Sequence, residues 1–262
     1  MNTIEYGQGA VNNTIGWGQG AKVGGSSFSN LKSIALDGVD DFVDCGDTND
    51  FSFTTGSSDL PFSVSFWVKL NSTSGFDAFV SKDAGGSNRE WTIGTFTNLR
   101  RVRFFLKNQG GSSQQSIEGN IPLTVGQWNN VVCTYDGRGG STAYQGLNIY
   151  IDGVLTTVSA TVSQTYSHMS NTSAPLAIGS YASSAYLQGG MDEVAIFSSE
   201  LSQSDVTAIY GTGVPTSLSS YSSLISWWRC GDGDTAPTLT DNKGSNNGTM
   251  TNFSTFSTDV PT

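Results

Sequence analysis

The feature that most constrains the fold of this chain is a strict alternation of side chains from Phe62 to Leu70, which reads Phe-Ser-Val-Ser-Phe-Trp-Val-Lys-Leu. Successive side chains of a β-strand point to opposite faces, so every second residue of this run falls on one apolar face. Such a face is stable only when a second layer covers it. The run therefore predicts a core strand of a layered β-protein.

Similar but shorter runs recur along the chain, at Ile34–Leu36, Trp91–Ile93, Val102–Leu106, Trp128–Tyr135, Leu147–Ile151, Leu176–Ile178 and Met191–Phe197. Asp-Gly pairs, which favour tight turns, stand at residues 37–38, 136–137 and 152–153. Many short strands joined by such turns predict an all-β fold, a two-sheet antiparallel jelly-roll sandwich, and argue against strand–helix–strand units.

One short helix is predicted after Ser202. This serine can act as the N-cap, and Asp205, three residues later, can complete a capping box. Leu201 can pack against Val206 across the cap, and Gly211 can end the helix. We expect the helix to lie against one end of the sandwich.

The first thirty residues differ from the rest, because they repeat an aromatic-Gly-Gln-Gly-Ala unit at residues 6–10 and 17–21. Closely spaced glycines make a chain costly to order, so this stretch should not fold alone. Each repeat carries one aromatic anchor, Tyr6 or Trp17, that can be buried against another surface. We predict that residues 1–30 form an extended assembly arm.

The charge, the start of the chain and the cysteine content argue against several kinds of partner and site. The net charge of −10 repels phosphate backbones, so we expect no nucleic-acid partner. The chain begins without the features of a signal peptide and has no apolar run long enough to span a membrane, so we expect folding in a cytoplasm and no membrane insertion. Cys45, Cys133 and Cys230 are odd in number and far apart, which indicates buried free thiols and neither disulfides nor a zinc site.

Five blocks of sequence follow the order typical of one family: residues 33–43 (Ser-Ile-Ala-Leu-Asp-Gly-Val-Asp-Asp-Phe-Val), 62–68, 127–137 (Gln-Trp-Asn-Asn-Val-Val, then Thr-Tyr-Asp-Gly), 147–153 and 190–197. With these blocks the chain resembles the LamG-like (laminin G / concanavalin A-like) jelly-roll family over about residues 31–213. The resemblance implies two antiparallel sheets packed face to face, in agreement with the alternation.

The C-terminal part departs from the family order. Leu224–Trp228 and the polar segment 241–250 look like the family's usual opening, yet they come last. A permuted sandwich would explain this order, and insertion into a neighbouring subunit would explain it equally well. We predict three parts: the arm at 1–30, a jelly-roll domain at 31–213, and a segment at 214–262 that completes the same or a neighbouring sandwich.

The repeat and the C-terminal segment are also similar to those of tailed-bacteriophage virion proteins, in which LamG-like modules serve as capsid decorations, head fibres or tail-fibre parts. The resemblance implies a non-enzymatic virion structural protein, assembled in the host cytoplasm with other virion proteins and copies of itself. The alternative is a carbohydrate-binding adhesin for host-surface glycans. A glycoside hydrolase is a distant third.

The sequence offers little for catalysis. A Ser-His-Asp triad would depend on His168, the sole histidine, which stands in a polar loop-like stretch. The Glu-x-Asp-x-Glu strand of concanavalin-like glucanases is missing, although glycoside hydrolysis needs two facing carboxyl groups. Asp192 and Glu193 are adjacent, and we expect them to point to opposite faces of a strand. We predict that the chain is not an enzyme.

Two kinds of site remain as hypotheses. Calcium favours carboxylate and carbonyl oxygens from turns, which Asp37, Asp40, Asp41 and Asp192 could supply, and the alternative is that these residues only form turns. For contact with a glycan or an acidic partner, the candidates are Arg101 and Arg103 on one strand face and the rings of Trp91, Tyr181 and Tyr186. The alternatives are solvated charges and, for Trp91, a core position.

Overall fold

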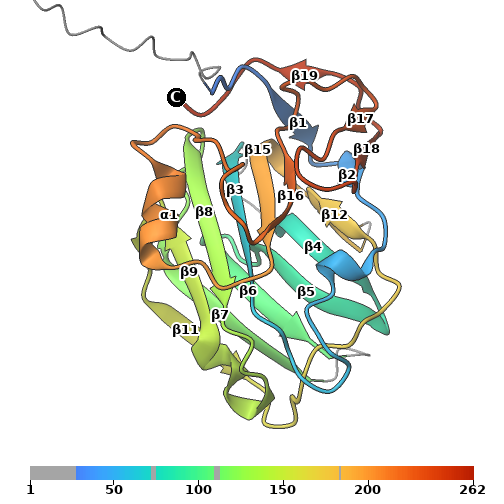
Figure 1. Cartoon of the computed structure of the whole chain (residues 1–262), viewed down its shortest axis with the longest axis vertical. Coiled ribbons are helices and arrows are strands. Elements are labelled where there is room, and N and C mark those ends of the chain that lie inside the picture. The colour runs from blue at the N-terminus through green and yellow to red at the C-terminus, as the bar shows by residue number, and fades with distance from the viewer. Residues whose placement is uncertain (1–27, 72–74, 109–112, 183) are drawn as a thin grey trace, which may run out of the picture.

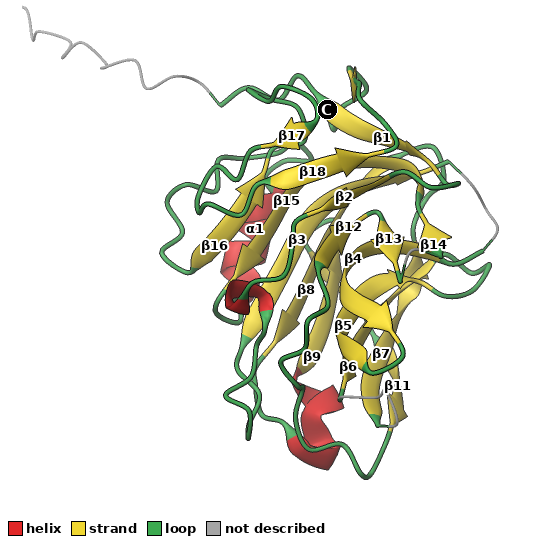
Figure 2. Cartoon of the chain, turned by 90° about the vertical axis from the view of Figure 1, so that its right-hand side faces the viewer, coloured by secondary structure: helices red, strands yellow, loops and turns green. Residues whose placement is uncertain are grey.

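The computed structural model describes residues 28–71, 75–108, 113–182 and 184–262, and these form two antiparallel sheets packed face to face (Figure 1, Figure 2). The eight-stranded sheet runs in the order β10 (Val154–Leu155), β9 (Leu147–Ile151), β8 (Trp128–Tyr135), β3 (Phe62–Leu70), β15 (Gln188–Phe197), β1 (Ser33–Asp37) and β19 (Phe256–Ser257), and β16 (Leu224–Trp228) also pairs with β15. The predicted jelly-roll sandwich is confirmed.

The second sheet has nine strands, in the order β11 (Val158–Val162), β7 (Gln114–Pro122), β6 (Arg101–Lys107), β5 (Asn88–Thr95), β4 (Asp77–Gly85), β12 (Leu176–Ile178), β2 (Phe42–Asp44), β18 (Gly248–Thr251) and β17 (Thr238–Leu239). Strands β13 (Ser180–Tyr181) and β14 (Ala185–Tyr186) form a two-stranded hairpin that belongs to neither sheet. In the part of the chain that the structure describes, the helices are α1 (Gln203–Tyr210) and short 3₁₀ turns at Asn49–Phe51 and Gly140–Gly146.

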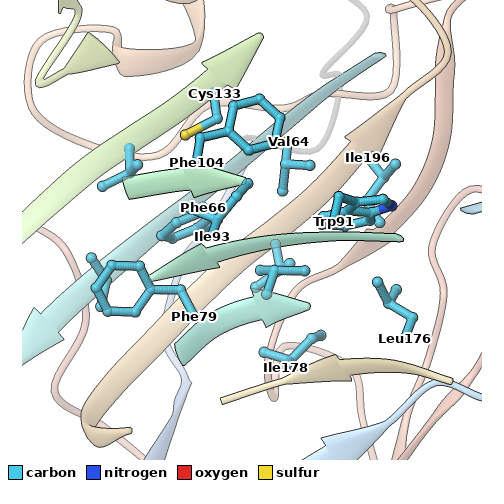
Figure 3. Close-up of a cluster of buried hydrophobic side chains, with 14 of the residues drawn as sticks. Val64, Phe66, Phe79, Trp91, Ile93, Phe104, Cys133, Leu176, Ile178 and Ile196 are labelled. Carbon is cyan, nitrogen blue, oxygen red and sulfur yellow. The ribbon is translucent and has the colours of Figure 1, made fainter. Parts of the chain in front are cut away.

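The main core lies between the two sheets. From β3 it receives all five apolar residues of the alternating run, and from the facing sheet it receives side chains such as Phe79, Trp91 and Phe104 (Figure 3). Cys45 and Cys133 belong to this core as small apolar groups. Together with Cys230 they are free and buried.

A second, smaller core covers the outer face of the eight-stranded sheet. Ser63, Ser65 and Trp67, which alternation alone would leave in water, are at most 3% exposed there. Helix α1 closes this face, and the Trp67 ring stacks on Tyr210 at 5.9 Å. The helix has the predicted capping box between Ser202 and Asp205. No helix in the described residues is long and apolar enough to cross a membrane.

The C-terminal residues complete the sandwich of their own chain. Strand β16 pairs with the second half of β15, β18 pairs with β2, and β19 pairs with β1. The segment therefore contributes strands to both sheets.

A β-bulge in β15 corrects one sequence expectation. Asp192 lies opposite Trp67 and Ala195 lies opposite Ser65, so Glu193 and Val194 together oppose Phe66 alone. The extra residue returns Val194 to the main core and leaves both Asp192 and Glu193 on the outer face, where Trp227 Nε1 donates a hydrogen bond to Glu193. The prediction that the two carboxyl groups point to opposite faces was wrong.

The start of the described chain packs across this outer face. The Phe28 ring stacks on Trp227 at 6.1 Å, and Asn30 Nδ2 donates a hydrogen bond to Asp192 Oδ2 at 2.8 Å. Residues 28–30, assigned to the predicted arm, therefore contact the sandwich. Tyr6 and Trp17 lie outside the described residues.

Candidate functional site

A hollow of about 460 Å³ opens at the edge of the sandwich beside the β13–β14 hairpin. It lies between the turn after β1, the start of β4 and the start of β15. The lining residues are Gly38, Phe76, Asp77, Tyr181, Ser184, Ala185, Tyr186 and Gln188. Its volume lies in the usual range for small-molecule sites, and its lining combines aromatic rings with a few polar groups.

The turn after β1 forms one wall because β1 pairs with β15, which places Asp37 opposite Gln188. The next residue, Gly38, has φ +80°, and a Cβ atom built there would lie 2.7 Å from Gln188 Cβ. Glycine is therefore required for both the turn and the close approach. This wall joins the hollow to the acidic turn of residues 37–41.

Aromatic rings form the opposite wall. Phe76 lies 5.3 Å from Tyr181, and Tyr186 lies 6.2 Å from Phe42, with both distances between ring centroids. The hairpin that carries the tyrosines is fastened to β4, since Ser81 Oγ donates to the Ser180 carbonyl at 2.7 Å. The rings are thus held in place before any ligand arrives, which reduces the entropy lost on binding.

Asp77 is the single carboxylate among the residues that line the hollow. Burial raises the pKa of Asp77. The shift is opposed by the Gln188 backbone N–H, which donates to one oxygen at 3.3 Å, and by the Thr95 hydroxyl, which donates to the other at 3.4 Å. Each carboxylate oxygen has one long hydrogen bond and a free lone pair, so Asp77 can accept a further hydrogen bond from a ligand hydroxyl.

The acidic turn brings three of the four predicted calcium ligands together. Oxygens of Asp37, Asp40 and Asp41 lie within 4.8 Å of one another. Two oxygens on the same calcium ion can be about 5 Å apart, so the spacing fits that ion. Burial and the two neighbouring charges raise the pKa of Asp41, which a bound cation would offset. These three residues would hold the ion and stiffen the turn.

Asp192 does not belong to this group. It lies four residues along β15 from Gln188, the partner of Asp37, which corresponds to roughly 13 Å of extended strand. Its carboxylate is fully buried and accepts hydrogen bonds from Asn30 and its neighbour's backbone. Its assignment as a calcium ligand was wrong, because the alternation of β15 turns it to the outer face, opposite Trp67 and away from the acidic turn.

Trp91 cannot stack on a sugar at the surface, since it is 0% exposed. Its ring lies in the main core, 5.4 Å from Phe62, and its Nε1 donates to the Phe51 carbonyl at 3.0 Å. The inward face of β5 determines this position, and the glycan-contact prediction for Trp91 was wrong.

Arg101 and Arg103 lie on the outer face of the nine-stranded sheet, outside the hollow. Arg101 faces Glu118 at 3.9 Å, and Arg103 donates to Ser116 and Thr161 while covering the Phe105 ring at 4.5 Å. Arg103 is thus already hydrogen-bonded within the sheet, whereas Arg101 makes one longer ion pair at the surface. Lys107 links this row to the hollow, because its Nζ lies 4.7 Å from the centre of the Tyr181 ring. The neighbouring rings of Phe105, Phe96 and Phe76 form a second link.

His168 has no catalytic partner arrangement among the described residues. Its Nδ1 lies 2.7 Å from the Met169 carbonyl. The nearby carboxylate, Asp59, is buried and accepts hydrogen bonds from Tyr135, Tyr166 and the Met169 amide. These contacts hold neighbouring loops together.

Sequence reasoning selected Tyr181 and Tyr186 but missed Phe76, Asp77 and Gln188. The missed residues come from two separate stretches, 76–77 and 188, which lie together in the structure because the Gln188 backbone N–H donates to Asp77 Oδ1. An aromatic residue after a glycine, as in Gly75-Phe76, was the one local signal.

Comparisons with solved structures agree with this architecture. A protein from Bacteroides ovatus to which carbohydrate binding has been attributed is 16% identical, with a TM-score of 0.61 over 89% of this chain and 62% of that protein. Two other structures have lower scores. The receptor-binding domain of botulinum neurotoxin serotype G is 18% identical, with a TM-score of 0.42 over 60% of this chain and 40% of that one. A heptameric SAP-like pentraxin from Limulus polyphemus is 13% identical, with a TM-score of 0.43 over 68% of this chain and 84% of that one. At these identities the first likeness establishes the fold alone, and the lower scores carry no argument.

A search of curated protein sequences found no match. The model of one family, however, matches residues 37–207, which is more than half of the chain and contains the acidic turn, the hollow and the bulged strand. The two antiparallel sheets fit that assignment. The chain belongs to the Concanavalin A-like lectin/glucanases superfamily.

Proposed function

We propose that the chain is a non-enzymatic carbohydrate-binding module and that its binding site is the hollow lined by Phe76, Asp77, Tyr181, Tyr186 and Gln188. The observation that carries the proposal is the pairing of fixed aromatic rings with a carboxylate in a cavity of about 460 Å³. Sugar rings present C–H faces that pack on aromatic rings and hydroxyls that donate to carboxylates. The B. ovatus protein of the same fold supports this ligand class.

A glycan array tests the proposal. The wild-type protein should bind a defined set of glycans, and Tyr181→Ala and Tyr186→Ala should each weaken that binding by at least tenfold, since each removes one wall. Tyr181→Phe and Tyr186→Phe are the matched controls, because they keep the ring and should retain most of the affinity. Unchanged binding in both alanine variants would place the glycan elsewhere.

The absence of turnover follows from the same geometry. Among the residues that line the hollow only Asp77 is acidic, whereas glycoside hydrolysis uses two carboxyl groups on opposite sides of the bond. Incubation with a polysaccharide panel should release no reducing sugar. Release that disappears in Glu193→Gln or His168→Ala would overturn this part of the proposal.

Calcium binding at Asp37, Asp40 and Asp41 is a further part of the proposal, and it predicts a measurable shift in stability. An ion that binds only the folded protein raises its melting temperature by mass action. We expect calcium to raise the melting temperature of the wild type and a chelator to lower it, with no response in the Asp40→Asn/Asp41→Asn double variant. Identical wild-type melting curves with and without chelator would reject the site.

The repeat at residues 6–21 supports a role in a virion, as a capsid decoration, head fibre or tail-fibre component. In this proposal the arm attaches the module to other virion proteins in the host cytoplasm and the hollow faces host glycans. Deletion of residues 1–27, which spares the Phe28 and Asn30 contacts, should leave the melting temperature unchanged and abolish incorporation into particles. Full occupancy of the truncated protein on purified particles would refute the attachment role.

A further inference from the structure

Strand β11 is exposed, and among the described residues it is the longest strand that ends either sheet. The paths of the two sheets end in β10, β19, β17 and β11, and the first three are two residues long whereas β11 has five. Strand β16 also has an outer edge. The Asn242 backbone N–H donates to the Trp227 carbonyl at 2.7 Å and so occupies a hydrogen-bonding group of that edge. In Figures 1 and 2, β11 lies at the margin of its sheet. It carries no charge, proline or bulge, the devices that usually protect an edge.

The register with β7 shows which backbone groups of β11 are free. The Asn120 amide donates to the Thr157 carbonyl at 2.9 Å, and the Ser163 amide donates to the Gln114 carbonyl at 3.1 Å. Hydrogen-bonded pairs alternate along an antiparallel ladder, so Ser159 and Thr161 also bond to β7. Val158, Ala160 and Val162 therefore direct their amides and carbonyls away from the sheet.

The free edge is complementary to itself. Read from Val158 to Val162, the strand is Val-Ser-Ala-Thr-Val, which is nearly the same in both directions. An antiparallel copy centred on Ala160 would pair each outward-facing residue with another outward-facing residue. Val158 would meet Val162 of the second copy, and Ala160 would meet itself.

We propose that two copies of this chain associate through β11, antiparallel and about a two-fold axis at Ala160, to form one continuous sheet across the dimer. Each of the three outward-facing residues then exchanges two hydrogen bonds with the second copy. The pairing is isologous, as expected for a closed dimer. The proposal is independent of sugar binding, since none of these residues lines the hollow.

Side chains at the edge favour the same partner. Val158 is 43% exposed and Ile121, its diagonal neighbour on β7, is 38% exposed, so pairing would remove apolar surface from water. The nearest acidic side chain across the ladder, Glu118 opposite Ser159, faces Arg101 at 3.9 Å. Two copies with a net charge of −10 each can therefore meet here without opposing unpaired carboxylates.

Sedimentation or light scattering of the full chain tests the dimer. The wild type should reach twice the 27.7 kDa of one chain as its concentration rises. Ala160→Pro removes an outward amide and leaves the β7 ladder intact, so it should remain monomeric with a normal melting curve. Val158→Lys should also be monomeric, whereas Leu99→Lys, a matched change at another exposed apolar residue, should still dimerise.

A crosslink tests the register. Ala160→Cys would face itself with Cα atoms about 5.5 Å apart, within reach of a disulfide, whereas Ser159→Cys would be offset from its copy. The native cysteines are buried and should not compete. We expect a covalent dimer from Ala160→Cys upon mild oxidation and at least tenfold less from Ser159→Cys. A monomeric wild type, a dimer that survives both Ala160→Pro and Val158→Lys, or equal crosslinking of the two cysteine variants would overturn the proposal.

Discussion

At the scale of single residues, several ionisable side chains are buried at positions where the hydrophobic pattern of the sequence did not indicate a strand. Lys82 is fully buried and places Nζ 2.7 Å from Asp47 and 3.5 Å from Glu90, while Lys107 pairs with Asp83 at 2.6 Å. Charged residues are almost never buried unless they are paired. For this reason hydrophobic alternation could not identify β4, whose sequence reads as a polar loop.

Glu193 gives a prediction at this scale. Burial raises its pKa from 4.5 to about 7, although Arg229 and the Trp227 indole oppose the shift. Between these values the folded protein holds a proton that the unfolded chain has lost. Glu193 therefore makes the free energy of unfolding fall as the pH rises through this window.

In Glu193→Gln this contribution disappears. We expect the difference in unfolding free energy between wild type and variant to decrease by about 3 kcal/mol from pH 4.5 to pH 7. Urea denaturation of both proteins across this range measures it. Parallel pH profiles would show that the carboxyl group titrates normally.

At the scale of elements, the sequence predicted the regular strands well. The alternating run became β3, and the capping residues became the ends of α1, because local periodicity and local hydrogen bonds determine both. The bulge in β15 could not be predicted. The bulge depends on the register of β15 with β3 and on the hydrogen bond that the Trp227 indole donates to Glu193. These partners lie far apart in sequence.

Strand β16 provides the prediction for this scale. It pairs with residues 194–197 of β15 and supplies Leu224 and Trp227 to the second core. A chain that ends at residue 213 would expose that core and the side of β15, so we expect it to lose cooperative unfolding. Circular dichroism during heating is the measurement, and the 28–262 fragment is the control. A sharp transition at the wild-type temperature would show that β16 is dispensable.

At the scale of the whole molecule, the site was predicted only in part. Tyr181 and Tyr186 were identified because aromatic rings can stack on sugars, and they line the same hollow in the structure. The remaining lining comes from β1, β4 and β15, whose proximity follows from strand order. No single stretch contains that information.

The C-terminal strands contribute to both sheets, so the sandwich should unfold as one unit. The five tryptophans of the described residues report on the packing, while far-ultraviolet circular dichroism reports on the strands. We expect the two signals to change at the same urea concentration, as in a two-state transition. Separate midpoints would instead identify the second core or the C-terminal segment as an independent unit.

The pairing of β1 with β19 gives the chain a further property. Ser33 lies opposite Ser257, and its hydroxyl donates to the Asp259 carbonyl at 2.7 Å, so the last strand returns to the first (Figure 1). Two strands that lie side by side at one edge of a sheet can be joined by a short connection without changing the packing. We expect a protein with β19 linked to β1 and new ends opened at the Asp152-Gly153 turn to keep the same sandwich.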